Sequence, residues 1–174
     1  MARPDDDGFT EFVRDHGPGL LRTACLLTGD RARGEDLAQT ALAKAFAHWP
    51  KVRRADHPLA YVRRTLVTSH LSWLRLLTNG EQVVASIPDR GDGADLQAAH
   101  AAADELRTAL LQLSPRVRTA VVLRYFDDLS EAETARLMRC SPSTVNTHVS
   151  RGLATLRELL STPGTYEETT RRPS

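Results

Sequence analysis

Apolar residues recur along most of the chain every three or four positions, which is the spacing of one face of a helix. The stripe formed by Leu37, Ala41, Ala45 and Trp49 is typical. No segment alternates apolar and polar positions in the way of a half-buried strand. The pattern therefore predicts an all-α chain, with helices at 9–28, 31–49, 57–77, 101–113, 115–127, 130–138 and 142–160.

Residue types suited to helix starts support several of these boundaries. Ser114–Pro115 and Ser141–Pro142 each place a hydroxyl at the N-cap and a proline at the first helical position, where its missing N–H costs nothing. Ser130 and Glu133 have the spacing of a capping box. Gly17–Pro18 inside the first predicted helix favours a bend there.

A segment of different composition separates the helices into two groups. Residues 79–96, NGEQVVASIPDRGDGADL, contain three Gly, one Pro and four acidic residues, which is the composition of a flexible linker. We therefore expect two small helical domains, 1–78 and 101–160, joined by a flexible acidic linker at 79–100 and followed by a disordered tail at 161–174. Each domain buries only a modest core, so a larger partner is expected to fix the spacing between them.

Overall composition says little about partners, but the distribution of charge says more. The chain has 174 residues, 41% of them apolar and 26% charged, and a net charge of +1, which is typical of a folded protein and gives no overall reason to bind nucleic acid or an anionic membrane. Residues 1–80 hold 12 basic and 9 acidic groups, residues 81–105 hold 1 and 6, and residues 106–174 hold 10 and 7. Two mildly basic blocks therefore flank an acidic segment.

Several function classes find no support in the residues. Cys25 and Cys140 stand outside any CxxC or His-rich cluster, so we expect no zinc site and interpret both as small buried apolar residues. The six His residues lie on separate predicted elements without a catalytic or phosphate-loop motif, so neither an enzyme nor a cofactor is expected. No signal sequence or apolar run of roughly 18 residues is visible, which favours a cytoplasmic protein with no membrane partner.

The segment LSEAETARLMRCSPSTVNTHVSRGLATLRELL has the plan of a helix-turn-helix, in which a short capped helix meets a break at 139–141 and a second helix begins at Pro142. Its expected buried positions are Ala132, Ala135, Leu137 or Met138, Val145, Val149, Leu153, Leu156 and Leu160. The polar residues left pointing outward on the second helix are Ser143, Thr144, Asn146, Thr147, Ser150 and Arg151. Such groups suit contacts to base edges and phosphates.

An ordinary helical hairpin with a solvated face would show a similar apolar pattern. From Arg136 to Arg157, however, there are four Arg and no Asp or Glu, whereas a solvated face normally mixes both signs. The charge pattern therefore favours DNA binding.

Two further faces stand out in the N-terminal group of helices. Residues 34–49 form an amphipathic helix whose expected core side is Leu37, Ala41, Phe46 and Trp49 and whose outward side is Asp36, Gln39, Thr40, Ala43, Lys44 and Ala47. Residues 51–75 hold six basic groups and one acid, interleaved with Tyr61 and Trp73. Cations that follow phosphates and rings that stack on bases are what single-stranded nucleic acid requires, although Tyr61 and Trp73 would equally suit a core.

Three motifs, in a fixed order, resemble a known family. They are LLRTACLLTGDRARGEDLAQTALAKAFAHW, PLAYVRRTLVTSHLSWLR and LSPRVRTAVVLRYFDDLSEAETARLMRCSPSTVNTHVSRGLATLR. Over residues 9 to about 160 the chain resembles the extracytoplasmic-function (ECF) sigma factors of bacterial RNA polymerase, and within them the short SigE-like actinobacterial group.

The resemblance implies a sigma factor that directs promoter-specific initiation and assigns a role to each surface. Asp36, Gln39, Thr40 and Lys44 would dock on the clamp helices of the polymerase's largest subunit. Region 2, at 1–78, would melt and read the promoter minus-ten element through Tyr61, Arg63, Arg64, Thr68, Trp73 and Arg75. Region 4, at 101–160, would touch the polymerase flap and read the minus-thirty-five element through Ser143, Thr144, Asn146, Thr147 and Arg151. Whether an anti-sigma factor is a further partner stays open.

The sequence also departs from the family pattern. Thr68 stands where the family usually has Asn, Leu76–Leu77 follow Arg75 where arginines are common, and Asn146 stands where Lys is frequent. Arg139 replaces the usual turn Gly, and a non-glycine residue at positive φ costs on the order of 1 kcal/mol. These departures from the family pattern imply a promoter preference shifted from that of the group.

A second class fits part of the pattern, namely a DNA-binding regulator that never touches polymerase. Such a protein binds duplex DNA as a dimer on a two-fold site. Its dimer contact needs an apolar face, and the outward residues of 34–49 are too polar to supply one. The sequence therefore favours the sigma factor.

Overall fold

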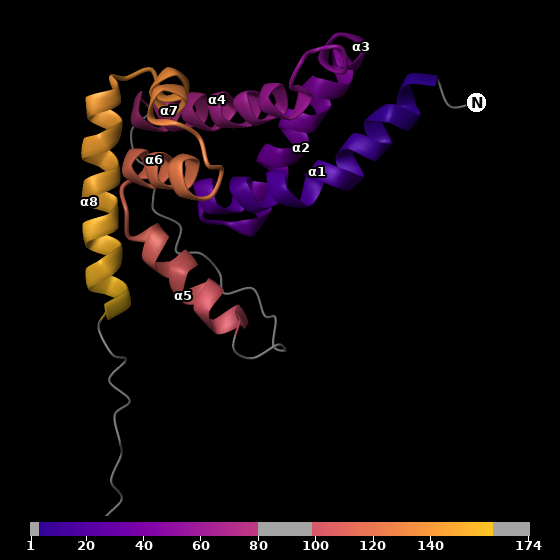
Figure 1. Cartoon of the computed structure of the whole chain (residues 1–174). Helices are drawn as coiled ribbons and strands as arrows, with labels where there is room; N and C mark the ends of the chain where they lie inside the picture. Colours follow the sequence, from indigo (N-terminus) through magenta and orange to yellow (C-terminus); the bar gives the residue numbers. More distant parts are fainter. Residues whose placement is uncertain (1–3, 80–98, 162–174) are drawn as a thin grey trace, which may run out of the picture.

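The computed structural model describes residues 4–79 and 99–161, and within these ranges every regular element is a helix (Figure 1). The helices are α1 (Pro4–Thr28), α2 (Arg31–Ala47), α3 (Trp49–Val52), α4 (Pro58–Asn79), α5 (Ala99–Leu111), α6 (Pro115–Tyr125), α7 (Glu131–Met138) and α8 (Pro142–Ser161). The all-α prediction is confirmed. The predicted linker and tail lie, but for their end residues, outside the described residues.

In the N-terminal group, the start of the first helix and the end of the second differ from the prediction. α1 begins at Pro4 rather than residue 9 and runs through Pro18 as one helix. The helix expected to reach residue 49 ends at Ala47, because His48 leaves helical geometry at φ −118° and ψ 20°. A separate short helix, α3, follows with Pro50 in its first turn, where the missing N–H is tolerated.

The N-terminal half, α1–α4, packs α1 against α2 and α2 against α4 around one core. Its fully buried side chains include Ala24, Ala41, Val62 and Leu66. Gly34 lets α2 approach α1 closely, because a Cβ at this position would lie only 2.8 Å from the Cα of Cys25. Small residues at this crossing thus set the distance between the helices.

In the C-terminal half, α5–α8, the last helix packs on α5, α6 and α7. The capping box is confirmed, because the Ser130 hydroxyl accepts from the Glu133 N–H and the Glu133 carboxylate accepts from the Ser130 N–H. Ser141 likewise accepts from the Thr144 N–H at 3.1 Å. Ser114 precedes Pro115 as expected, but its side chain makes no capping hydrogen bond.

The two halves pack directly on each other, contrary to the expectation that a larger partner fixes their spacing. α6 lies against α1 and α7 lies against α4 (Figure 1), and one core cluster contains side chains of both halves. At the contact, Thr23 donates to the Asp127 carboxylate at 2.7 Å, and Arg118 donates to the Leu27 carbonyl at 3.3 Å. Burial of shared apolar and polar surface holds the halves together.

Some expected core positions are exposed instead. Phe46 is 48% exposed, because it lies in the last turn of α2 and only one side of its ring packs on Phe9, with the two ring centroids 4.9 Å apart. Leu160, 41% exposed, falls in the last turn of α8, and Ala132 lies on the outer side of α7. Cys25 and Cys140 are half-buried thiols rather than fully buried residues.

Candidate functional site

The N-terminal half of α8 presents the polar surface that the helix-turn-helix pattern predicts. Ser143, Asn146, Thr147 and Arg151 are exposed and Thr144 is half-buried, while Val145 and Val149 on the opposite side are buried. The Thr147 hydroxyl donates a hydrogen bond to the Ser143 carbonyl at 3.0 Å. The side chains of Asn146 and Arg151 form no hydrogen bond with another described residue, so the amide and guanidinium are available to a base or phosphate.

The turn before α8 has left-handed geometry at a residue other than glycine. Arg139 has φ 53° and ψ 49°, and the Cys140 N–H bonds back to the Ala135 carbonyl, as in a Schellman ending. Arg139 therefore does adopt a positive φ, the case in which a non-glycine residue at this turn costs free energy. Arg139 is exposed, so no packing requirement explains the choice of a large side chain at this position.

The predicted docking residues share one exposed face of α2. Asp36, Gln39, Thr40 and Lys44 are all exposed. Lys44 donates to the Ser69 hydroxyl of α4 at 3.1 Å, and Thr40 donates to the Asp36 carbonyl at 2.8 Å. The face borders a groove of about 480 Å³. Its lining residues are Thr28, Arg33, Asp36, Leu37, Thr40, Ser69, His70 and Trp73.

The structure divides the minus-ten candidates on α4 into two sets. Tyr61, Arg64, Thr68 and Arg75 follow one side of the helix at intervals of three, four and seven, and we call this set the α4 stripe. Tyr61 is 42% exposed, so it is not a core residue. Arg64 and Arg75 are also exposed, whereas Thr68 is half-buried and donates to the Arg64 carbonyl.

The two remaining minus-ten candidates point elsewhere. Arg63 forms an ion pair with the buried Asp127 carboxylate of the C-terminal half, with Nε and Oδ2 3.7 Å apart. Trp73 faces α2, where the Arg33 guanidinium lies 5.4 Å from its ring centroid. The structure therefore does not join all six candidates into one surface.

The C-terminal half covers part of the α4 stripe. Thr68 and Arg75 line a cavity of about 230 Å³ whose other wall comes from α6, α7 and the turn after α7. The lining residues are Thr68, Leu71, Ser72, Arg75, Arg116, Leu137, Met138 and Arg139. A single strand of DNA could lie along the whole α4 stripe only if the wall formed by α6, α7 and the turn after α7 moved away.

Two buried titratable groups lie close to these surfaces and escaped the sequence analysis. Burial lowers the pKa of His70 to about 4, with a smaller contribution from the Arg118 charge, and neither ring nitrogen has a partner among the described residues. Burial raises the pKa of Asp127, against the opposing effects of the Thr23 hydrogen bond and of Arg63 and Arg22. His70 follows Val62 and Leu66 at four-residue spacing, a signal that could have placed it in the core, but Asp127 carried none.

The described residues offer neither a metal-binding cluster nor a membrane-spanning helix. No three His, Cys, Asp or Glu side chains gather closely enough in 4–79 and 99–161 to hold a metal ion. Within the same ranges no helix has the length and apolar character to cross a bilayer.

Models of known protein families match both halves of the chain. The family model for Sigma-70 region 2 matches residues 12–78, and that for Sigma-70, region 4 matches residues 103–156. The RNA polymerase sigma-E factor of Streptomyces antibioticus is 35% identical over 162 residues, which are 93% of this chain and 89% of that protein. The ECF RNA polymerase sigma factor SigW of Bacillus subtilis is 24% identical over 178 residues, covering 92% of each chain.

A solved structure shows the same fold. The sigma factor RpoE from Bartonella quintana, in complex with the anti-sigma factor NepR, has a TM-score of 0.64 and 25% sequence identity, covering 89% of this chain and 98% of that one. The two matched regions and the sequence relatives agree with this likeness. The chain therefore belongs to the sigma-70 family of RNA polymerase sigma factors, in its ECF group.

Proposed function

We propose that this chain binds core RNA polymerase and directs it to promoters by reading a minus-ten and a minus-thirty-five element. The observation that carries the proposal is the presence of two polar, basic helix faces on the two halves that match sigma regions 2 and 4. The polymerase performs the phosphoryl chemistry. The chain contributes base specificity and needs no cofactor for this role.

Docking is assigned to the exposed face of α2. Asp36, Gln39, Thr40 and Lys44 offer charges of both signs and hydroxyl and amide groups, which suits a polar helix-to-helix contact with the clamp helices of the largest subunit. The C-terminal half is assigned a contact with the polymerase flap. Region 2 is proposed to span 1–78, the linker 79–100, region 4 101–160 and the tail 161–174.

Promoter recognition is divided between α4 and α8. The α4 stripe combines an exposed aromatic ring with two guanidinium groups, which suits stacking and phosphate contacts on a melted strand. Arg63 and Trp73 join it only when the contacts to Asp127 and Arg33 are released. On α8, Ser143, Thr144, Asn146, Thr147 and Arg151 are assigned to the minus-thirty-five duplex.

Regulation and location follow from the same family. A solved relative is a sigma factor held by an anti-sigma factor, which supports an anti-sigma partner for this chain as well. With the proposed action on RNA polymerase and promoter DNA, we assign the protein to the cytoplasm.

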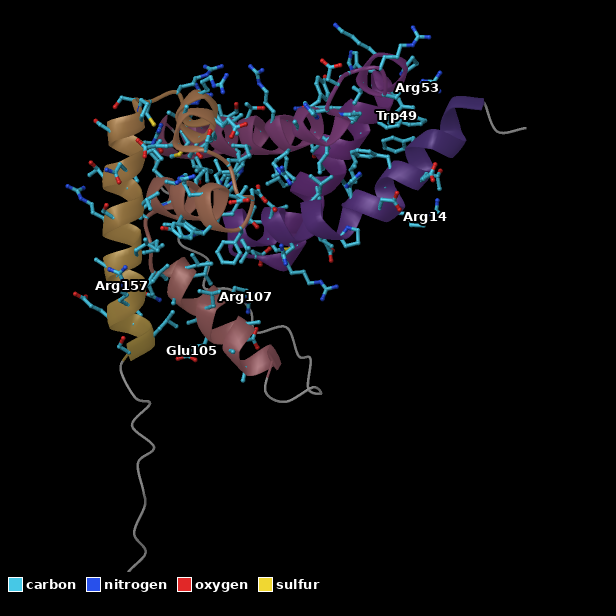
Figure 2. The ribbon with its side chains drawn as sticks, viewed as in Figure 1. Arg14, Trp49, Arg53, Glu105, Arg107 and Arg157 are labelled. Carbon is cyan, nitrogen blue, oxygen red and sulfur yellow. The ribbon has the colours of Figure 1, made fainter. Side chains whose placement is uncertain are left out.

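The test is co-elution with actinobacterial core polymerase in size exclusion, with the Asp36→Arg variant beside the wild type. Charge reversal on the docking face should abolish or strongly weaken co-elution. The matched control is Glu105→Arg, since Glu105 is an exposed acid on α5, far from α2 (Figure 2). It should co-elute like the wild type.

Two results would contradict the proposal. Equal co-elution of Asp36→Arg and wild type would remove the docking assignment. A folded wild type that stays apart from core and binds duplex DNA as a dimer would identify a stand-alone regulator instead.

A further inference from the structure

The turn between α7 and α8 holds an arginine where the backbone favours glycine. At φ 53°, Arg139 places its Cβ against the preceding carbonyl, a conformation that costs side-chain-bearing residues free energy and costs glycine little. Arg139 is exposed and forms no side-chain hydrogen bond or ion pair with another described residue. Among the described residues, its guanidinium therefore has no polar contact that would offset the strain.

A second arginine from another helix lies next to it. Arg116, in the first turn of α6, lines the same 230 Å³ cavity as Arg139 and is exposed as well. Its charge reaches the start of α8: burial raises the pKa of Cys140 and the Arg116 charge opposes that rise, whereas burial lowers the pKa of His148 and the charges of Arg116 and Arg151 lower it further. The pair thus lies beside the polar end of α8.

The surroundings of the pair are electropositive. Arg75 lines the same cavity, whereas no acidic residue contributes to its wall. Like charges that converge without a counter-charge raise the local potential and attract an anion. The Ser72 hydroxyl in the same wall accepts from Arg75 and keeps its own proton to donate to such an anion.

We propose that Arg116 and Arg139 bind the sugar–phosphate backbone of duplex DNA beside the minus-thirty-five element. This inference rests on the proposed function, because it takes α8 as the helix that reads that element. In this role the two arginines are positioning residues: they fix the register of α8 on the duplex while α8 itself contacts the bases. The strained Arg139 is then explained by DNA binding rather than by the turn.

A phosphate contact has a specific signature in the salt dependence of binding. Each contact contributes about one unit to the slope of log affinity against log salt concentration and does so on every sequence. Arg139→Gly and Arg116→Gln should each reduce the slope by about one and weaken promoter binding roughly 3- to 10-fold at about 0.1 M salt. The double variant should reduce the slope by about two.

The experiment uses holoenzyme assembled from core polymerase and the full chain, on a promoter duplex selected with the wild type, with fluorescence anisotropy across a salt series. Arg139→Lys keeps the charge and should keep the wild-type slope. Arg157→Gln is the matched control, since Figure 2 shows Arg157 on the part of α8 far from α7. It removes one exposed arginine charge from α8 and should leave the slope unchanged.

Stability separates the role in binding from a role in folding. Because glycine relieves the left-handed backbone, Arg139→Gly should unfold at a temperature no lower than the wild type while it binds promoter less tightly. Unchanged slopes for Arg139→Gly and Arg116→Gln would overturn the inference. An effect that vanishes when a single base pair is changed would also overturn it, because that is the behaviour of a base contact.

The proposed function is tested separately by the wild type. If the wild type forms no holoenzyme or selects no promoter, both the function and this inference are contradicted. If the wild type binds its promoter, and Arg116→Gln and Arg139→Gly bind it with the wild-type affinity and slope, the inference alone is contradicted.

Discussion

At the scale of single residues, the most consequential side chain that the sequence analysis missed is His70. It is only 2% exposed, and its pKa of about 4 lies below the ordinary value of 6.5 because burial disfavours the charged ring. Between these two values the unfolded chain binds a proton that the folded chain does not. The contribution of His70 to the free energy of unfolding is therefore fully present above pH 6.5 and is lost as the pH falls from there through about 4.

His70→Leu should remove this acid-dependent loss. The wild type is expected to lose about 3 kcal/mol between pH 6.5 and pH 4 through this group, from the shift at about 1.4 kcal/mol per unit. Urea unfolding across that range measures the loss. The exposed His57 supplies the control, and His57→Gln should keep the wild-type pH profile. A His70→Leu profile as steep as the wild type would show that another group causes the acid sensitivity.

At the scale of elements, helix periodicity predicted most helices and their inward faces, because periodicity is a local property of the sequence. α3 escaped since four residues are too short to show a period. The end of α2 at Ala47 and the exposure of Phe46 depend on how the chain turns at His48. The exposed faces of α2 and α8 were predicted from the same periodicity, and their roles in binding stay predictions.

The crossing of α1 and α2 gives an element-scale prediction. Gly34→Ala would place a Cβ 2.6 Å from the Cys25 Sγ and 2.8 Å from its Cα, and the backbone of α1 can move away only by separating the helices. We expect a loss of roughly 1–3 kcal/mol in the free energy of unfolding, measured by urea denaturation.

Gly19→Ala is the matched control within α1, because a Cβ there meets nothing within 4 Å. Alanine is the better helix former by about 1 kcal/mol, so this variant should be at least as stable as the wild type. An equal gain in stability for the two variants would mean that helix propensity, and not the close approach of α1 and α2, governs the effect of Gly34→Ala.

At the scale of the whole molecule, the contact between the halves could not be predicted. Thr23 and Asp127 are 104 positions apart, and nothing in a local pattern pairs a hydroxyl on α1 with a carboxylate after α6. The same contact occupies Arg63 and brings α7 over the end of the α4 stripe. The sequence predicted the surfaces, but which of them are covered depends on tertiary packing.

Asp127→Arg should drive the halves apart, because it replaces a buried partner of Arg63 with a like charge. Distances between a spin label on α2 and one on α8 should lengthen and broaden in the free protein. The neighbouring Asp128 is exposed, and Asp128→Arg should leave the distances as in the wild type. Unchanged distances in Asp127→Arg would show that the halves stay together without the contacts of Asp127, through the apolar contact and the Arg118–Leu27 hydrogen bond.

Arg118 ties the folding of one half to the folding of the other. This buried guanidinium donates to the carbonyls of Leu110 and Leu111 at the end of α5 and of Leu113 just after it, and to that of Leu27 at the end of α1. If either half melted alone, it would leave buried donors or carbonyls of the other without partners, an open state with a steep free-energy cost. The two regions, which separate family models match, should therefore melt in the free protein as a single cooperative unit.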